Sequence, residues 1–232
     1  MLTPARRRGF EILDDPAVDR DVRLQSMGDV VRSNQWLGGL RAASTELRAV
    51  LPTLRQDQPV TLLDVGTGLA DIPQAAARAA RQVGVQLWSV GFDGAAAVLL
   101  EARRRTSCVV CGSALALPFA DHSVDIVMCS QLLHHFTDTE ACGVLRELDR
   151  VARHSVIVSD LRRSWIAALG FWLVSFPLRF HRVTRHDGVL SVLRGFTTGE
   201  LRELVRDAVS AVPTVRRRPG FRITARWRPA AA

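Results

Sequence analysis

Residues 60–160 alternate short apolar, β-branched segments with segments of helical periodicity, and this alternation limits the possible folds most strongly. The expected strands are 60–65, 86–91, 108–112, 124–129 and 155–159, and the expected helices are 72–83, 95–105 and 138–152. Such alternation predicts a parallel sheet with right-handed crossovers and helices on both faces. Further on, residues 214–218 and 221–227 flank a Pro-Gly turn and predict a terminal hairpin.

The first expected strand ends in a glycine turn, Asp64-Val65-Gly66-Thr67-Gly68, which is followed by Ala70 and Asp71. Glycine there allows backbone angles that a Cβ forbids and lets a ligand approach the main chain. A dinucleotide site would place a pyrophosphate at the following helix N-terminus, where Asp64 and Asp71 would repel it. The sulfonium and ammonium groups of S-adenosylmethionine are positive and suit these carboxylates better.

Asp93 closes the second expected strand. An acidic side chain at this place can accept hydrogen bonds from both hydroxyls of a ribose. That placement fits both a dinucleotide and S-adenosylmethionine, since each contains a ribose.

Three segments resemble motifs of the class I S-adenosylmethionine-dependent methyltransferases. The glycine turn is similar to motif I, D-x-G-x-G, with Ala70 at the usual third glycine. Residues 112–125 resemble G-D-A-x-x-L-P-F-x-D-x-S-F-D, with Ser113 in place of the aspartate, and residues 129–136 resemble the segment S-x-x-L-H-H. These motifs cover residues 60–160 in the family's order and spacing.

The resemblance implies a Rossmann-like α/β fold with a seven-stranded, mostly parallel sheet that ends in the antiparallel hairpin, helices on both faces, and S-adenosylmethionine as cofactor. In the family, the glycine turn holds the methionine portion and the loop after the third strand holds the adenine. The cofactor-binding residues then expected are Asp64, Gly66, Thr67, Gly68, Asp71, Asp93, Gly94, Ser113, Ala114, Cys129, Ser130 and His134.

One region precedes the expected cofactor domain, residues 59–232, and a second, the substrate lid, lies within it. Residues 1–58 predict a partly ordered arm and two helices, separated at Gly38-Gly39, that form a cap. At about 162–196 the family has its substrate lid, and here Trp165 to Pro177 is apolar but too short to span a bilayer. Its aromatic face suits a lipophilic acceptor. Trp36, Trp165 and Trp172 are candidate acceptor contacts, with ordinary helix packing as the alternative.

Methyl transfer from a sulfonium depends mostly on positioning. A phenolic acceptor also has to lose a proton, which costs about 4 kcal/mol at pH 7. His186, beside Asp187, is the first candidate for a general base, and His135 is the second. Arg182 and Arg185 are candidates for neutralising the acceptor oxygen. Each histidine has a structural or solvent-exposed role as its alternative.

The composition limits partners and compartment. All 31 basic residues are arginine and the formal net charge is +8, which raises nucleic acid or an anionic membrane as partners. The arginines are scattered rather than interleaved with aromatic residues, so no nucleic-acid partner is expected. Cys108 and Cys111 have the C-x-x-C spacing of redox or zinc sites, but a strand would turn them to opposite faces, so no metal is expected.

The N-terminal residues show no targeting peptide, which predicts a cytoplasmic protein, either monomer or homodimer. The apolar lid followed by arginines resembles, more loosely, methyltransferases of quinones, phenolic lipids and polyketides. We therefore expect a small-molecule methyltransferase of secondary metabolism, O-methylation ahead of C-methylation, with peripheral membrane contact as a possibility. The alternatives are a non-catalytic cofactor-binding regulator and an RNA methyltransferase.

Overall fold

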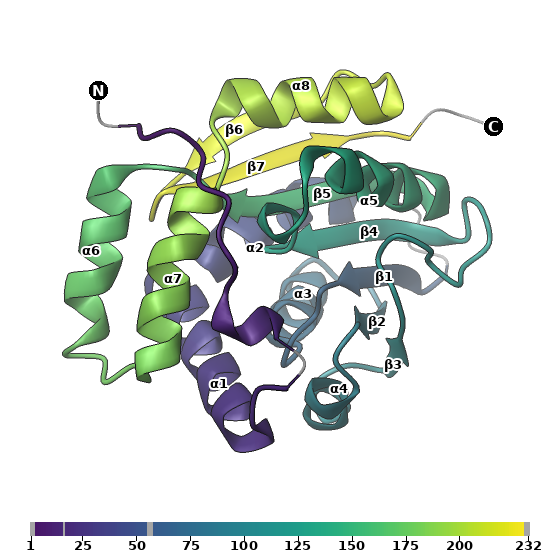
Figure 1. Cartoon of the computed structure of the whole chain (residues 1–232). Coiled ribbons are helices and arrows are strands. Elements are labelled where there is room, and N and C mark those ends of the chain that lie inside the picture. The colour runs from purple at the N-terminus through teal and green to yellow at the C-terminus, as the bar shows by residue number, and fades with distance from the viewer. Residues whose placement is uncertain (1–2, 16, 55–57, 230–232) are drawn as a thin grey trace.

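The protein is described here from a computed structural model, in which residues 3–15, 17–54 and 58–229 are placed. Its centre is a seven-stranded sheet in the order β3-β2-β1-β4-β5-β7-β6 (Figure 1). The strands are β1 Val60–Val65, β2 Leu87–Asp93, β3 Cys108–Cys111, β4 Val124–Ser130, β5 Ala152–Leu161, β6 Thr214–Arg218 and β7 Arg222–Trp227. Strands β1 to β5 are mutually parallel, and β7 is antiparallel to both β5 and β6. The predicted fold class, including the terminal hairpin, is confirmed.

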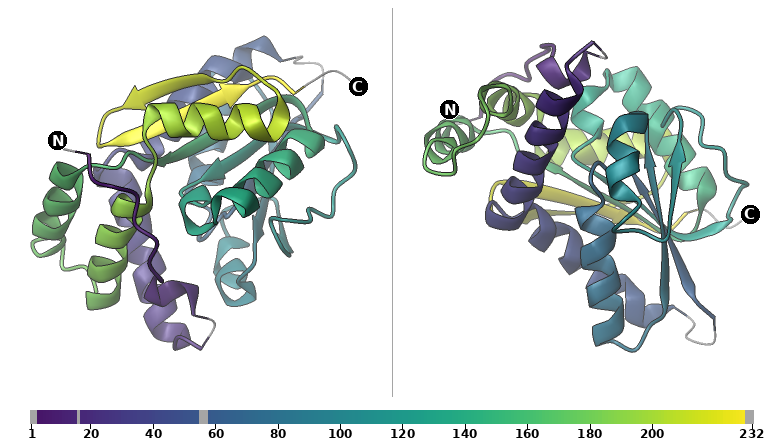
Figure 2. Two further views of the ribbon diagram at one scale, coloured as in Figure 1. Left: turned by 45° about the horizontal axis from the view of Figure 1, so that its top comes forward. Right: turned by 90° about the horizontal axis from the view of Figure 1, so that it is seen from below.

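Helices cover both faces of this sheet (Figure 2). They are α1 Arg20–Trp36, α2 Gly39–Val50, α3 Asp71–Gln82, α4 Ala96–Ala102, α5 Asp138–Val151, α6 Trp165–Ser175, α7 Arg182–Arg194 and α8 Thr198–Val209, and the 3-10 turns are η1 Ile12–Asp14, η2 Leu51–Thr53 and η3 Leu133–His135. Because side chains alternate along a strand, Leu62 packs with α2 and α3 on one face, whereas Leu63 packs with α5 and α8 on the other.

Local sequence signals set several helix starts. Thr197 and Glu200 form a capping box at the start of α8, and Thr137 and Glu140 form a second one at α5. Gly38 separates α1 from α2 with φ +88°, and a Cβ there would lie 2.7 Å from the carbonyl oxygen of Pro219. Two helices, α1 and α2, therefore precede the sheet and are separated at Gly38.

Helices α6 and α7 lie side by side next to the carboxyl ends of β4 and β5 (Figure 1). Residues 179–188 are rich in arginine and histidine, which disfavours a core position, yet most of them form the first half of α7, with Val183, Thr184 and Asp187 buried. Both are possible because Arg182 and His186 are exposed while the buried residues face the other side of the helix. Within the described residues, no helix has both the length and the apolar character needed to cross a membrane.

The N-terminal arm, residues 3–15, crosses the carboxyl end of the sheet between α7 and α5 (Figures 1 and 2). The amide of Arg7 donates to the carbonyl of Leu193 at 3.1 Å, and Arg163 donates to the carbonyl of Pro4 at 2.8 Å. Arg6 and Arg8 both pair with Asp138. The arm thereby becomes part of the wall around the carboxyl ends of the strands.

Candidate active site

A cavity of about 750 Å³ lies at the carboxyl ends of β1, β2 and β4. Its wall combines the glycine turn, the N-terminal arm, α1, α7 and η3. In an open α/β sheet, ligands bind at the carboxyl edge where the strand order reverses, here between β1 and β4. The cavity therefore occupies the usual nucleotide position of this architecture.

The glycine turn lies against this cavity with its main chain exposed to it. Gly66 has φ +77° and Gly68 has φ +53°, the left-handed conformation that favours glycine. Asp93 fastens the turn to β2, because its carboxylate accepts the amide of Gly68 and the amide of Ala95, both at 2.9 Å. Gly66, Gly68, Asp93 and the following Gly94 all line the cavity.

Asp64 and Asp71, the other two acidic residues expected to face the cofactor, do not line the cavity. Asp64 is 1% exposed and neither carboxylate oxygen has a hydrogen-bond partner among the described residues, so burial raises its pKa to about 8. Asp71 accepts a hydrogen bond from Asn34 at 2.9 Å, and burial also raises its pKa. The carboxylate at this cavity next to the glycine turn is that of Asp93.

The remaining predicted cofactor residues divide into two groups. His134 lines the cavity. Thr67, Ser113, Ala114, Cys129 and Ser130 do not. Ser113 is exposed and accepts the amide of Leu115 at 3.3 Å, whereas Thr67 and Ser130 have buried hydroxyls without partners among the described residues.

A histidine turn, His134-His135 in η3, projects into the cavity beside Glu11 of the arm. His134 is buried, and its Nδ1 lies 2.6 Å from the Asp160 carboxylate at the end of β5. Nδ1 of His135 lies 2.8 Å from the carboxylate of Asp14. Burial opposes ionisation of Asp14, but hydrogen bonds from His135 and Arg194 bring its pKa down to about 2.

Arg194 of α7 ties this turn to the arm. Its guanidinium donates to the carbonyls of His134 and His135 at 3.0 and 2.7 Å, and it contacts Glu11 at 3.2 Å and Asp14 at 3.1 Å. Glu11 is itself buried, which raises its pKa. Glu11, Asp14 and Arg194 are absent from the sequence-based predictions because they lie far from the histidines in sequence and match no local motif.

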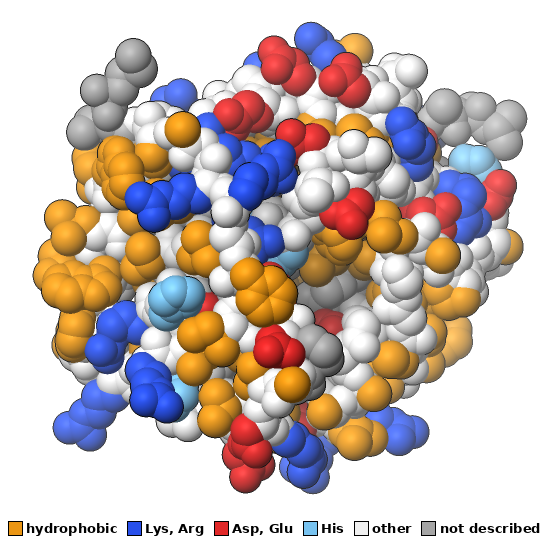
Figure 3. Space-filling view, viewed as in Figure 1, with side chains coloured by type: hydrophobic (Ala, Val, Ile, Leu, Met, Phe, Trp, Pro, Cys, Tyr) orange, Lys and Arg blue, Asp and Glu red, His pale blue; other side chains and the backbone are white. Residues whose placement is uncertain are grey.

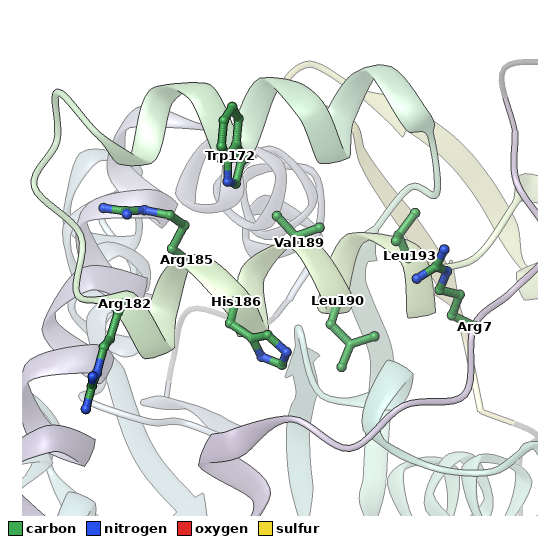
Figure 4. A pocket seen from close by; sticks show the side chains of 8 residues that line it. All are labelled: Arg7, Trp172, Arg182, Arg185, His186, Val189, Leu190 and Leu193. Carbon is green, nitrogen blue, oxygen red and sulfur yellow. The ribbon is translucent and has the colours of Figure 1, made fainter.

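The residues predicted to bind the acceptor lie outside the 750 Å³ cavity at the carboxyl ends of β1, β2 and β4, which we call the cofactor cavity. Arg182, Arg185, His186 and Trp172 line a separate recess of about 450 Å³ between α6, α7 and the arm (Figure 4). There the ring of His186 pairs with Asp187 at 2.8 Å, while the Asp187 carboxylate accepts the amides of Ile12 and Leu13. Asp187 thus anchors the arm.

The contacts of Arg185, and of the two remaining predicted acceptor residues, Trp165 and Trp36, differ from one another. Arg185 donates to the Ser175 hydroxyl at 3.0 Å and stacks on Phe176, so it connects α7 with the end of α6. Trp165 is exposed beneath the guanidinium of Arg7. Trp36 is 73% exposed and lies at the edge of a third cavity.

This third cavity, of about 460 Å³, lies between the end of α1, α6 and the β6–β7 turn. It shares four wall residues with the cofactor cavity: Leu161, Phe171, Val192 and Arg222. Arg222 is buried, donates to Gln131 and to the carbonyl of Leu37, and has no ion-pair partner among the described residues. Burial lowers its pKa to about 10. No sequence pattern distinguishes it from the other arginines of the hairpin.

Comparisons with known proteins agree with this geometry. Residues 63–158 match the family model described as a methyltransferase domain. No curated protein sequence matches the chain.

Solved structures with a similar fold include a SAM-dependent methyltransferase from Aquifex aeolicus, at TM-score 0.56 and 17% identity over 79% of this chain and 89% of that one. An O-methyltransferase family protein from Burkholderia thailandensis has TM-score 0.60 and 16% identity over 94% and 62%. Magnesium protoporphyrin IX methyltransferase from Synechocystis, with SAH bound, has TM-score 0.50 and 15% identity over 93% and 90%.

Proposed function

We propose that this protein, an S-adenosylmethionine-dependent methyltransferase with the class I fold, methylates a hydroxyl oxygen of a lipophilic small molecule. The observation behind the proposal is that the cofactor cavity shares four wall residues with the third cavity. The cofactor would occupy the first and the acceptor the second, which we call the acceptor cavity. The acceptor would thus meet the cofactor without crossing bulk solvent.

The wall of the acceptor cavity favours an apolar acceptor. Ile166, Gly170, Phe171 and Val174 of α6 form one side, and Phe221 of the β6–β7 turn lies opposite. A cavity of about 460 Å³ with mostly apolar walls and few polar groups is typical of sites for drug-sized molecules. Trp36 extends this surface at the cavity's edge.

Arg222 gives this site a charge that suits an ionised acceptor oxygen. A buried guanidinium without a carboxylate partner favours a ligand that supplies negative charge. Ionising a phenol with a pKa near 10 costs about 4 kcal/mol at pH 7, and a nearby cation lowers that cost. We therefore assign Arg222 to the acceptor oxygen, in place of the predicted Arg182 and Arg185.

The histidine turn is the second group that we assign to the acceptor hydroxyl. His135 lines the cofactor cavity, whereas His186, the first candidate for a base, lines the separate recess. His186 also shares its hydrogen-bond partner, Asp187, with two amides of the arm. The location of the two residues therefore favours His135 for contact with a reacting group.

The surface beside the acceptor cavity suits access from a membrane. Seven large apolar side chains on or next to α6 are exposed, namely Trp165, Ile166, Leu169, Trp172, Leu173, Val174 and Phe176. Figure 3 shows hydrophobic side chains gathered there, at the left edge of the molecule, with arginines below them. Ile166 and Val174 belong both to this surface and to the cavity wall. We propose that the acceptor enters from an anionic membrane surface.

Gly170 offers a direct test. A Cβ built on it meets no atom within 4 Å, so a phenylalanine at this position would occupy open space in the acceptor cavity. We expect Gly170→Phe to abolish transfer of labelled methyl groups to alkylated phenols and quinols while S-adenosylmethionine binding is unchanged. Product NMR would identify the methylated oxygen.

Gly170→Ala is the matched control, because one methyl group leaves most of the cavity open. It should retain the kcat/KM of the wild type. Unchanged turnover in Gly170→Phe, or methylation of polar acceptors in preference to alkylated ones, would contradict the assignment of this cavity.

A further inference from the structure

We propose that Glu11, His134 and His135 bind a divalent transition-metal ion, with zinc preferred. The Nε2 atom of each histidine lies 3.9 Å from a carboxylate oxygen of Glu11. All three ligand atoms lie within 4.8 Å of one another. Ligand atoms around a tetrahedral zinc ion with bonds of about 2.0 Å are roughly 3.3 Å apart. Small shifts of the three side chains would therefore bring their ligand atoms to the spacing that zinc requires.

The two imidazoles are oriented as metal ligands are. Each Nδ1 faces a carboxylate, Asp160 at 2.6 Å for His134 and Asp14 at 2.8 Å for His135. Donation from Nδ1 leaves the lone pair on Nε2, which is the arrangement found for most metal-bound histidines. The carboxylates thereby direct both lone pairs toward Glu11.

An unsatisfied buried atom points to a missing partner. The side chain of His134 is 2% exposed, and its Nε2 has no hydrogen-bond partner among the described residues. Buried polar atoms in native proteins are nearly always satisfied. A cation at the centre of the three side chains would satisfy this atom.

The charges around the cluster leave room for two positive charges. Glu11, Asp14 and Asp160 are three carboxylates, and Arg194 is the guanidinium in contact with this set. With neutral imidazoles the group carries a net charge of −2. Two of these carboxylates, Glu11 and Asp160, are buried, whereas Asp14 is exposed. Burying the two charges is costly unless a counterion is present, and a divalent ion supplies one.

Three protein ligands leave at least one coordination position open, as in catalytic zinc sites. Glu11, His134 and His135 all line the cofactor cavity, so the open position faces the ligands there. If the proposed O-methylation holds, the acceptor hydroxyl would bind the ion and release its proton to solvent. The oxygen then forms the bond to the methyl carbon, and the electron pair of the carbon–sulfur bond goes to the sulfur.

The test measures metal binding without any acceptor, so it does not depend on the proposed reaction. Cys108 and Cys111 are exposed and free, and they are a second possible zinc site, so both are first changed to serine. This protein is stripped with a chelator and titrated with Co²⁺ and then Zn²⁺. We expect one ion per chain, with cobalt d–d bands and no thiolate charge-transfer band.

Substitutions of the proposed ligands test whether the ion binds at this cluster. Glu11→Gln and His135→Asn should weaken Zn²⁺ binding at least about 100-fold, and Asp14→Asn about 10- to 100-fold, as outer-shell changes do. His186→Asn is the matched control, because His186 also pairs with a carboxylate but lies outside the cavity. Melting curves verify that each variant is folded.

Two results would overturn the proposal: no stoichiometric Co²⁺ or Zn²⁺ binding in the cysteine-free protein, or binding that Glu11→Gln and His135→Asn leave unchanged. In either case the cluster is a network of ion pairs and hydrogen bonds. Failure of the acceptor assays alone would instead count against the proposed reaction.

Discussion

Asp64 lies at the carboxyl end of β1 without a hydrogen-bond partner among the described residues, and burial raises its pKa to about 8. In the unfolded chain an aspartate has a pKa near 3.9. Between these values the folded state holds a proton that the unfolded state has lost, so the free energy of unfolding falls as the pH rises. The expected slope is about 1.4 kcal/mol per pH unit, between about pH 4 and pH 8.

We predict that Asp64→Asn removes its part of this slope, because an amide does not titrate in this range, whereas Asp71 and Glu11, whose pKa values burial also raises, keep theirs. Urea unfolding from pH 4.5 to 8 would measure it. Asp207→Asn, an exposed position on α8, should retain the wild-type slope. If both variants show the same pH dependence as the wild type, Asp64 is ionised in the folded protein.

Arg222 is the residue whose replacement tests the acceptor site most directly. Arg222→Met keeps most of the side-chain volume but removes the charge between the two cavities. Hydrogen bonds to charged groups contribute about 1.5–3 kcal/mol, so the acceptor KM should rise roughly 10- to 100-fold. The dissociation constant of S-adenosylmethionine should change little.

Arg216→Met is the control for this change, since Arg216 lies exposed on the neighbouring strand β6. Arg216→Met should leave the acceptor KM and the dissociation constant of S-adenosylmethionine unchanged. A larger effect of Arg222→Met on cofactor binding than on the acceptor KM would show that the guanidinium serves the cofactor.

The site residues differ in how far the sequence could predict them. Gly66, Gly68 and Asp93 stand in a local motif that sets their backbone and their place at a strand end, and all three line the cavity. Glu11, Arg194 and Arg222 reach the site only through tertiary packing of the arm, α7 and the hairpin. Single-sequence patterns carry no information on such partners.

Among the helices, α6 and α7 depend on one glycine for their close packing. A Cβ on Gly188 of α7 would lie 2.1 Å from the Phe171 ring of α6. We predict that Gly188→Ala lowers the free energy of unfolding by about 1–3 kcal/mol, because overpacking displaces the ring or the helix. Denaturant unfolding measures this change.

Gly170→Ala on α6 is again the control, since the Cβ of the new alanine would have no atom within 4 Å. Alanine has a higher helix propensity than glycine, so the free energy of unfolding of this variant should rise by up to about 1 kcal/mol. Equal effects of the two substitutions would mean that the Phe171 ring moves aside at no cost in stability. Because Phe171 lines both cavities, Gly188→Ala should also reduce turnover.

The elements with strong local signals were predictable from sequence. The apolar runs of β1 and β4 and the capping box of α8 each determine their own structure. Helix α7 was missed because its arginines and histidines hide a narrow buried side made of Val183, Thr184 and Asp187. The arm was expected to be partly ordered, but its contacts come from distant residues such as Asp187 and Asp138.

For the whole molecule, the exposed side of α6 is the feature that the fold alone does not explain. Leu169 and Leu173 stand one turn apart and are 58% and 53% exposed. Arginines flank this side, with Arg7 over the ring of Trp165 and Arg185 over that of Phe176. Apolar side chains surrounded by cations match the surface of an anionic bilayer, because burial of the apolar side chains and attraction of the arginines to the lipid headgroups both favour binding.

We predict that the protein co-sediments with vesicles containing phosphatidylserine, and that added salt weakens this binding because the arginine contribution is screened. Leu173→Glu should reduce binding at least about 10-fold, since burying a leucine contributes about 1.5–3 kcal/mol and the new charge repels the lipid. Val212→Glu adds the same charge at a 79% exposed position outside α6 and should bind as the wild type does. Equal loss in both variants would indicate non-specific attraction by net charge, and the acceptor would then reach its cavity from water.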